Sequence, residues 1–372
     1  MKAVILVGGE GTRLRPLTCN IPKPMVPIVN RPFLEHMIAY LKLHGITEIV
    51  LALGYLPKHI ETFFGDGSNF GVSLTYSVEK APLGTAGAVK NLQTLIDGPF
   101  VVFNGDVFTD LDLTEMIKLH RRHRSKATLF LTPVEDPTAF GVVETDGTGR
   151  VLRFTEKPKR EEVRANTING GCYVLEPEVL DEAPGGQFYM FERSLFPRLL
   201  EMGAPMYGFL STGYWLDIGT PDSYIQLHHD LVSGAVNSPA LTQGISRGAG
   251  CEIAPSANLV GPVVMGDGCK IGSDVHVEGP VVLGPGCSIE EGSSLHDTVL
   301  WQGARVGPHS TLRRCVLGNR ASVGTRVSIT DGAIIGDDVQ IGDDNVLERG
   351  VAVWPGKSIP SNTLFFAKGR NR

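Results

Sequence analysis

Several features that would indicate other classes of protein are missing from this sequence. No apolar run approaches the roughly 18 residues that a membrane-spanning helix needs. The net charge of −6 gives no general attraction to nucleic acid or to an anionic membrane. None of the six cysteines forms a C-x-x-C pair, which argues against a zinc site. The amino terminus shows no secretory leader. These absences predict a cytoplasmic protein that binds neither membranes nor nucleic acid.

The chain has 372 residues, more than one hydrophobic core usually serves, so two domains are expected. Residues 1–232 alternate short apolar runs, such as "KAVILVG", "EIVLALG" and "PFVVFNGD", with stretches of helical periodicity. This alternation predicts an α/β domain with a Rossmann-like, mostly parallel sheet covered by helices on both faces. Sheets of this kind bind ligands beyond the carboxyl ends of their strands.

From about residue 250 the pattern changes, because apolar residues recur at every sixth position. A six-residue period is typical of a parallel β-helix, whose coils stack around a narrow apolar core. We therefore predict an α/β domain over 1–232, a linker over 233–250 and a β-helix over 251–372. The series is interrupted once, and its members are Ile253, Leu259, Met265, Ile271, Val277, Leu283, Ile289, Leu295, Leu317, Val323, Ile329, Ile335, Ile341, Leu347, Val353 and Ile359.

Four of the cysteines follow the same frame. Cys251, Cys269 and Cys287 recur once in every three repeats, and Cys315 stands at the same place in its repeat. A ladder of disulfides or metal ligands would be a functional interpretation of this spacing. The simpler interpretation is a small apolar residue that points inward at the coil corners, since free cysteine behaves as a small hydrophobe.

The stretch "LVGGEGTRLRPLT", residues 6–18, directly follows the first predicted strand. Glycines let backbone N–H groups approach a ligand closely, and arginines pair with phosphate. The stretch lacks the Lys-Ser/Thr of a P-loop, and it lacks the third glycine of a dinucleotide fingerprint. It therefore predicts a phosphate-binding loop of another kind.

This stretch, followed by "PKP" at residues 22–24, closely resembles the signature of the sugar nucleotidyltransferases. These enzymes join a nucleoside triphosphate to a sugar 1-phosphate and release pyrophosphate. In detail the chain looks most like the mannose-1-phosphate guanylyltransferases, and its carboxyl-terminal half resembles their left-handed β-helix. Further segments match the family in order: "PLGTAGAV" at 82–89, "NGDV" at 104–107, "FGVVE" at 140–144, "FTEKP" at 154–158, "INGGCYVL" at 168–175 and "YWLDIGTP" at 214–221.

The resemblance implies a role for each matching residue. Arg13, Lys23 and Asp106 would be catalytic, and Asp106 and Asp217 would supply the hard oxygen ligands that suit one Mg²⁺. The implied nucleotide-binding residues are Leu6, Gly8, Gly9, Gly11, Thr12, Arg13, Lys23, Glu79, Pro82, Gly84, Thr85 and Asp106. The implied sugar-phosphate-binding residues are Gly141, Glu156, Lys157, Asn169 and Asp217.

The predicted reaction joins GTP and mannose 1-phosphate to give GDP-mannose. One alternative is a glucose 1-phosphate enzyme that uses dTTP, UTP or ATP. A second is a bifunctional protein with an acyltransferase site in the β-helix, where His276, His296 and His309 lie. A third is a non-catalytic regulatory member, although such proteins usually lose the arginine, the lysine or an aspartate, and all are present here. The β-helix also predicts a homo-oligomer.

Overall fold

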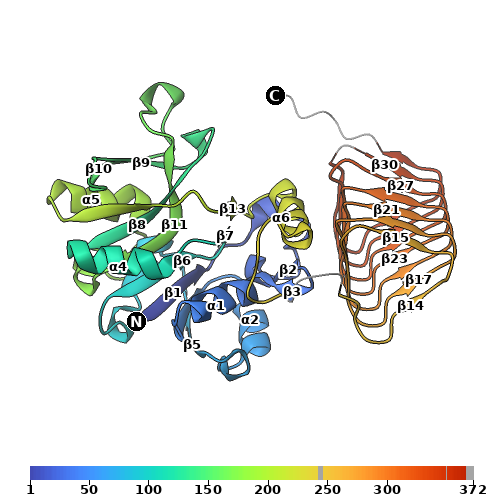
Figure 1. The fold of residues 1–372 in the computed structure, drawn as a ribbon, viewed down its shortest axis with the longest axis horizontal. Helices are drawn as coiled ribbons and strands as arrows, with labels where there is room; N and C mark the ends of the chain where they lie inside the picture. Colours follow the sequence, from blue (N-terminus) through green and yellow to red (C-terminus); the bar gives the residue numbers. More distant parts are fainter. Residues whose placement is uncertain (242–245, 349, 366–372) are drawn as a thin grey trace. The chain divides into compact units, whose positions relative to one another are not determined.

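The computed structural model describes residues 1–241, 246–348 and 350–365. These residues form two compact units, of which one consists of Met1–Glu10 and Met37–Asp217 and the other of Gly11–His36 and Ile218–Arg372. Figure 1 labels their helices and strands along the chain. The units do not follow chain order, because Gly11–His36 is grouped with the carboxyl-terminal half. Part of the predicted linker, 242–245, and part of the predicted β-helix domain, 349 and 366–372, lie outside the described residues.

The first unit is built on a mixed sheet whose strands β6, β1, β4 and β5 lie side by side and run parallel. Apart from the edge strand β5, these strands are almost continuously apolar and buried, as expected for a parallel sheet covered on both faces. Their bounds are β1 Lys2–Val7, β4 Glu48–Leu53, β5 Ser73–Val78 and β6 Phe100–Asn104.

The other part of this sheet is largely antiparallel. β11 pairs antiparallel with β6, β8 and β9, β10 pairs antiparallel with β9, and β12 pairs parallel with β8. No α-helix lies between β8 and β11 in the described chain, and without a long crossover successive strands cannot return in parallel. The α/β class is confirmed, with a sheet that is mixed. The bounds are β8 Ala127–Pro133, β9 Gly141–Thr145, β10 Val151–Glu156, β11 Thr167–Leu175 and β12 Met206–Leu210.

Helices connect and cover these strands. α3 packs on β1, α4 packs on β8, β11 and β12, and α5 packs on β10. Every helix in the described part of the chain is too short or too polar to cross a lipid bilayer. The helix bounds are α1 Phe33–Leu43, α2 Pro57–Phe64, α3 Gly84–Lys90, α4 Leu113–His123 and α5 Phe196–Glu201, and a short ribbon pairs β7 Val107–Thr109 with β13 Trp215–Asp217.

The second unit begins with two short 3₁₀ turns, Thr12–Leu14 and Lys23–Met25, and a hairpin of β2 Pro27–Ile28 and β3 Arg31–Pro32. Its helix α6, Pro221–Ser233, starts at a capping box. Thr220 Oγ1 accepts a hydrogen bond from the Ser223 backbone N–H, and Ser223 Oγ accepts one from the Thr220 N–H. The rest of this unit is the carboxyl-terminal repeat region.

The repeat region is a parallel β-helix with three all-parallel sheets of two- and three-residue strands, as predicted. One sheet holds β14 Glu252–Ile253, β17 Lys270–Ile271, β20 Ser288–Ile289, β23 Arg305–Val306, β26 Ser322–Val323, β29 Gln340–Ile341 and β32 Ser358–Ile359. The second holds β15 Asn258–Val260, β18 His276–Glu278, β21 Ser294–His296, β24 Thr311–Arg313, β27 Ser328–Ile329, β30 Val346–Leu347 and β33 Leu364–Phe365. The third holds β16 Val263–Met265, β19 Val281–Leu283, β22 Val299–Leu300, β25 Val316–Leu317, β28 Ile334–Ile335 and β31 Ala352–Val353.

The six-residue series forms the core of this β-helix. All its members from Met265 onward are buried in one cluster, and Ile253 and Leu259 of the first coil are partly buried against it. The interruption in the series consists of two shortened corners, because Leu295 is followed by Leu300, and Leu312 by Leu317, at a spacing of five. Coils at both ends of the array therefore contain three full repeats, whereas those in the middle are shorter by a single residue.

The corner cysteines support the simpler interpretation of their spacing. The six cysteines form no disulfide in the described chain. The Cys269 thiol lies 3.2 Å from the Gly284 carbonyl oxygen of the next coil, and Cys287 makes the same contact with Trp301 at 3.1 Å. Burial raises the pKa of both thiols, to about 11 and about 12 respectively. They are thus packing residues that remain protonated at neutral pH.

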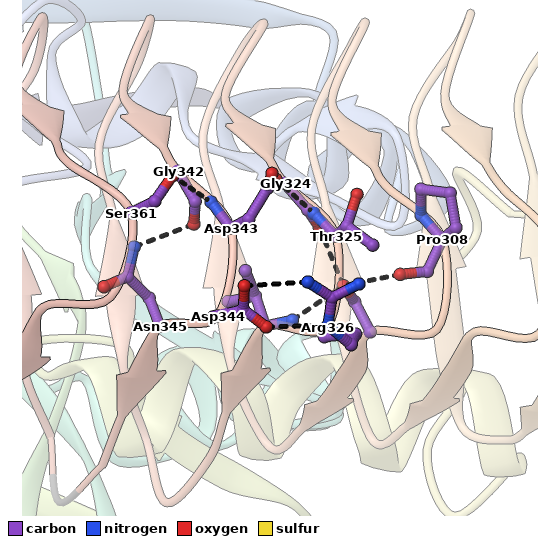
Figure 2. Close-up of polar contacts among 11 residues, drawn as sticks. Pro308, Gly324, Thr325, Arg326, Gly342, Asp343, Asp344, Asn345 and Ser361 are labelled. Atoms are coloured by element: carbon purple, nitrogen blue, oxygen red, sulfur yellow. Dashed lines mark hydrogen bonds and ion pairs between the residues drawn. The ribbon is translucent and has the colours of Figure 1, made fainter.

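Polar side chains connect successive coils on the outside. Figure 2 shows the Arg326 guanidinium facing the Asp344 carboxylate one coil on, with hydrogen bonds of 2.7 and 2.8 Å. Beside this pair, Asp343 accepts a hydrogen bond from the Thr325 backbone N–H at 2.8 Å, and Ser361 Oγ accepts one from the Asp343 N–H at 3.0 Å (Figure 2). Side chains of the following coil therefore accept hydrogen bonds from backbone N–H groups at the corners of the β-helix.

Candidate functional site

The glycine-rich loop follows β1, and the backbone segments that follow the neighbouring strands approach it closely. The Gly105 N–H donates to the Leu6 carbonyl oxygen at 2.9 Å, and a Cβ added to Gly105 would lie 2.4 Å from that oxygen. Likewise, a Cβ on Gly54 would lie 2.6 Å from the Gly8 carbonyl oxygen. An added Cβ at Gly9 meets no atom of the described residues within 4 Å. Packing therefore explains the glycines at 54 and 105 but not the one at 9.

Two predicted metal ligands are brought together by the ribbon of β7 and β13. This antiparallel pair places Asp217 opposite Val107, and Asp106 is the residue directly before Val107. Both aspartates are half-buried. No group of three or more potential His, Cys, Asp or Glu ligands occurs in the described residues. Two carboxylates nevertheless suit Mg²⁺, which usually takes its remaining ligands from water and substrate phosphate.

Glu79 stands at the end of β5, at the same edge of the sheet. Its Oε2 accepts a hydrogen bond from the Leu83 backbone N–H at 3.2 Å. Partial burial raises the pKa of Glu79, and this hydrogen bond opposes the rise. The carboxylate therefore holds the 82–85 segment, in which Pro82 is exposed and Gly84 takes a φ of 71°. A Cβ on Gly84 would also lie 2.7 Å from the Tyr189 carbonyl oxygen.

A partly buried hydrogen-bonded network joins the predicted nucleotide and sugar segments. Asn169 Nδ2 donates to the Tyr173 hydroxyl at 2.7 Å, and that hydroxyl donates to Glu192 Oε1 at 3.3 Å. Thr85 Oγ1 donates to the other oxygen of Glu192 at 3.0 Å. Glu192 is only 8% exposed and lies in a π-helical turn, Phe191–Leu195, a conformation frequent at functional sites.

Glu192 was not predicted from the sequence. Its only signal is an acidic residue inside the apolar stretch "FYMFERSLF", and such a residue is buried only when it is paired. The neighbouring glycines of "INGG" have a packing role, because a β-bulge follows Asn169 and a Cβ on Gly170 would lie 2.4 Å from the Phe130 ring.

The predicted sugar-phosphate residues of the "FTEKP" segment lie at the end of β10. Burial, together with the charge of Glu192, raises the pKa of Glu156, and the Lys157 ammonium acts in the opposite direction. A Cβ on Gly141 would lie 2.9 Å from Glu156 Oε2, so the glycine makes room for that carboxylate. Lys157 is exposed and has a φ of 48°, an uncommon conformation for a residue with a side chain.

The remaining signature residues belong to the second unit. Gly11 has a φ of 63°, and its carbonyl oxygen accepts a hydrogen bond from Thr18 Oγ1 at 2.8 Å. A Cβ on Gly11 would lie 3.0 Å from Cβ of Lys23, so the glycine allows the two segments to approach. Thr12 and Arg13 are exposed in the first 3₁₀ turn, whereas Lys23 is 8% exposed at the start of the second.

The sequence model of the nucleotidyl transferase family matches residues 2–234, more than half of the chain. The chain belongs to the nucleotidyl transferase family. A second model, the GMPPB C-terminal domain, matches residues 259–366. The predicted enzyme class is thereby confirmed: this nucleotidyl transferase forms nucleotide sugars from nucleoside triphosphates and sugar 1-phosphates, and members of the family generally use a divalent metal.

Individual relatives of this nucleotidyl transferase differ in their named substrates. A mannose-1-phosphate guanylyltransferase of Mycobacterium tuberculosis is 43% identical over 270 residues, which cover 71% of this chain and 74% of that protein. A UTP–glucose-1-phosphate uridylyltransferase of Synechocystis is 36% identical over 336 residues, which cover 84% and 86%. The solved structure of HddC from Yersinia pseudotuberculosis complexed with GMP-PN aligns with a TM-score of 0.53 and 31% identity, covering 61% of this chain and 97% of that one.

Proposed function

We propose that this enzyme forms GDP-mannose from GTP and mannose 1-phosphate and releases pyrophosphate. The observation that carries the proposal is the pairing of β7 with β13, which brings Asp106 and Asp217 together at the strand ends where the glycine-rich loop begins. The choice of guanine and mannose is supported by the name of the Mycobacterium tuberculosis relative and by the match to the GMPPB C-terminal domain.

The reaction needs no general base. A phosphate oxygen of the sugar 1-phosphate attacks the α-phosphorus of the triphosphate, and the bond to the bridging oxygen breaks as pyrophosphate leaves. The second ionisation of such a phosphate lies near pH 6, so the attacking oxygen is already charged at neutral pH. Two polyanions must still be brought together. Catalysis therefore rests on positioning and on neutralising charge.

We assign the triphosphate to the signature residues. The backbone N–H groups of Gly8, Gly9 and Gly11 would hold its oxygens. The Arg13 guanidinium would neutralise charge that develops on the departing pyrophosphate, and the Lys23 ammonium would hold the α- and β-phosphates. The base would lie against the segment of Glu79, Pro82, Gly84 and Thr85, and Leu6 would contribute its backbone at the end of β1.

Asp106 and Asp217 would hold Mg²⁺, because the β7–β13 register brings their backbones to neighbouring positions and no third protein ligand is required. When bound, the ion neutralises negative charge on phosphate oxygens. On the sugar side, the Lys157 ammonium would hold the phosphate of the acceptor. Glu156, Asn169 and the Gly141 backbone would contact the sugar hydroxyls.

A panel of nucleotides and sugar phosphates tests the proposal. Purified full-length protein is incubated with Mg²⁺ and each pair of GTP, ATP, UTP or dTTP with mannose or glucose 1-phosphate, and pyrophosphate release is measured. The highest kcat/KM is expected for GTP with mannose 1-phosphate. The glucose alternative, which the Synechocystis relative supports, prevails if UTP, dTTP or ATP with glucose 1-phosphate is turned over faster. Turnover of none of the pairs would favour the regulatory alternative.

The acyltransferase alternative requires a loop that leaves the coils to form a cofactor cleft. The strand register shows that each coil of the described β-helix is as long as three six-residue repeats or shorter by one residue. This length leaves no room for such a loop. His309 is exposed, and His276 is within hydrogen-bonding distance of the exposed Asn258. Consumption of acetyl-CoA that depends on His276, His296 or His309 would restore this alternative. Homo-oligomerisation and a cytoplasmic location stay predictions from the sequence.

A further inference from the structure

Trp301 occupies a place in the repeat where other coils have glycine. The residue after the inward-pointing one is Gly284 in the preceding coil and Gly318 in the next. The backbone N–H groups of all three residues donate to a carbonyl oxygen of the following coil, those of Leu300, Leu317 and Ile335. The Trp301 side chain is 2% exposed, yet it does not belong to the core inside the coils. Its indole therefore lies outside the coil and is covered by another part of the second unit.

That cover includes Tyr224 of helix α6. The indole Nε1–H of Trp301 donates to the Tyr224 hydroxyl oxygen at 2.9 Å, and the ring centroids lie 6.5 Å apart. The Tyr224 hydroxyl in turn donates its own proton to the Pro27 carbonyl oxygen. Because a phenol has one proton to donate, the two hydrogen bonds are compatible only in this order. The chain of contacts thus runs from the β-helix, through α6, to the segment that follows Lys23.

His228, one turn further along α6, fixes the same segment. Its Nε2 lies 3.2 Å from the Pro27 carbonyl oxygen, and its Nδ1 accepts a hydrogen bond from the Val29 N–H at 3.4 Å. These partners require the neutral tautomer with the proton on Nε2. Burial lowers the pKa of His228 to about 3, so this form persists at neutral pH.

The anchored segment continues directly into the turn that carries Lys23. The Val26 N–H donates to the Lys23 carbonyl oxygen at 3.1 Å, and the Met25 N–H donates to that of Pro22 at 2.8 Å. Pro27 follows Val26 immediately. A shift of the Pro27 carbonyl would therefore move the turn in which the Lys23 backbone is fixed.

A wider contact surface supports this connection. A row of apolar residues crosses neighbouring strands of one sheet, and it consists of Val282, Val299, Val316 and Ile334. Each of them is at most 4% exposed, although none belongs to the core inside the coils. Helix α6 packs against β19, which contains the first of these residues. The outer face of the sheet is therefore an internal packing surface of the second unit.

We propose that Trp301 is a positioning residue for Lys23, acting through Tyr224 and the Pro27 carbonyl. The proposal rests on the function proposed above, in which Lys23 holds the triphosphate. It assigns to the β-helix a part in the reaction without placing any of its residues on the substrate. Loss of the indole N–H leaves the Tyr224 hydroxyl without its donor, which loosens the turn around Lys23.

The test compares Trp301→Phe and Tyr224→Phe with Trp354→Phe in the full-length chain. Trp354 stands at the same place in its repeat, after Val353, but is half exposed. We expect Trp301→Phe and Tyr224→Phe each to lower kcat/KM for the triphosphate about 5–10-fold, the factor that corresponds to the net contribution of one hydrogen bond, whereas Trp354→Phe leaves it unchanged. Equal kcat/KM in all three variants and the unsubstituted enzyme would overturn the proposal.

A second measurement separates positioning from general damage to the fold. Each substitution is repeated in a Lys23→Ala background, in which the position of the side chain no longer matters. The effect of Trp301→Phe should disappear there, because residues that act through one another are not additive. A loss of the same factor in both backgrounds would show that the tryptophan acts by another route and would contradict the proposal.

A third measurement does not depend on the reaction. Hydrogen exchange at the Met25 and Val26 amides should become faster in Trp301→Phe and Tyr224→Phe but not in Trp354→Phe. Unchanged exchange would overturn the positioning role even if the enzyme is fully active. Faster exchange in an enzyme that turns over none of the substrate pairs would leave the positioning of this turn intact and would count only against the proposed function.

Discussion

Two sets of glycines in this molecule serve opposite purposes. In the β-helix, a Cβ added to Gly266, Gly284 or Gly318 would lie 2.6–2.7 Å from an atom of the following coil. In the loop after β1, a Cβ added to Gly8 would approach no atom of the described chain more closely than 3.6 Å. The coil glycines are needed because protein fills the space beside them. Packing does not explain Gly8 and Gly9 of the loop, and this fits the proposal above that phosphate oxygens approach their N–H groups.

The comparison indicates how stability and chemistry are divided in the chain. Substitutions in the strand-end loop and its carboxylates should remove activity and leave the fold intact. Substitutions at the coil corners should weaken the fold. They should change activity only indirectly, through the contacts of α6 with Pro27 and Val29. Each prediction below tests this division.

The largest effect is expected at the proposed metal ligands. Asp106→Asn should lower kcat by about 10²–10³-fold, the loss typical for one preorganised electrostatic contact. Because Asp106 is half-buried at a strand end, the melting temperature of the variant should stay close to that of the unsubstituted protein. Steady-state kinetics and thermal melting check this. A chelator should abolish turnover, and Mg²⁺ should restore it. A variant with near-normal kcat would remove Asp106 from the site.

A reciprocal pair of alanine substitutions tests the two kinds of glycine. Gly318→Ala places a Cβ 2.7 Å from Asp337 Oδ1 and 2.8 Å from the Asp337 backbone nitrogen, and should lower the free energy of unfolding by about 1–3 kcal/mol. Gly9→Ala should change it by less than about 0.5 kcal/mol but should lower kcat/KM for the triphosphate. Denaturant titration and kinetics on both variants decide this. The distinction between loop and coil fails if Gly9→Ala is the less stable variant.

The buried histidines of the second unit predict a loss of stability in acid. The pKa of His228 is lowered to about 3 and that of His36 to about 4, in both cases chiefly by burial. An unfolded histidine titrates near pH 6.5, so below that pH the unfolded chain binds protons that the folded chain does not. The free energy of unfolding should therefore fall between pH 6.5 and pH 4, by about 1.4 kcal/mol per pH unit for each histidine.

Denaturant titrations at several pH values check this slope. His228→Gln removes one of the two groups, and its stability should depend less steeply on pH in the same range. An identical slope in this variant would mean that other groups govern the acid sensitivity.

The smallest effect is expected at the ion pair drawn in Figure 2. The Arg326 guanidinium holds the pKa of Asp344 below its ordinary value, but Arg326 is exposed and Asp344 is partly exposed, and pairs near solvent contribute little. Arg326→Gln should therefore leave both the melting temperature and kcat/KM unchanged. Asp337→Ala is the matched contrast, because its buried carboxylate accepts hydrogen bonds from Asn319 and Asn20. A larger loss for Arg326→Gln than for Asp337→Ala would contradict this ranking.

Much of the fold follows from local patterns in the sequence. The six-residue period predicts which side chains enter the β-helix core, because each coil repeats the same turn and the same inward position. The strand-end positions of Gly8 and Asp106 follow from apolar runs that stop at polar residues. The antiparallel pairing of β11 with β6 was not predicted, because it joins strands far apart in sequence and depends on tertiary packing.

The candidate site was predictable where a motif is contiguous and not where it is assembled by the fold. The pairing of β7 with β13 places Asp217 by Asp106, and only the resemblance to known enzymes indicated this in advance. Glu192 and Trp301 carry weak signals, a lone acid in an apolar stretch and a tryptophan at a glycine position. Their roles depend on partners that are distant in the sequence, Thr85 and Tyr224.

The coils that contact the rest of the second unit lie in the middle of the array, which constrains how the repeat can change in length. Asn30 Nδ2 donates to the Leu283 carbonyl oxygen, and Asn20 Nδ2 donates to Asp337. An extra coil inserted between Trp301 and Asp337 would displace Asp337 by about 4.8 Å, the spacing of neighbouring strands. The contact with Asn20 would then be lost. Coils added after Ile359 would disturb none of these contacts, so the array can change in length beyond Ile359 without loss of these contacts.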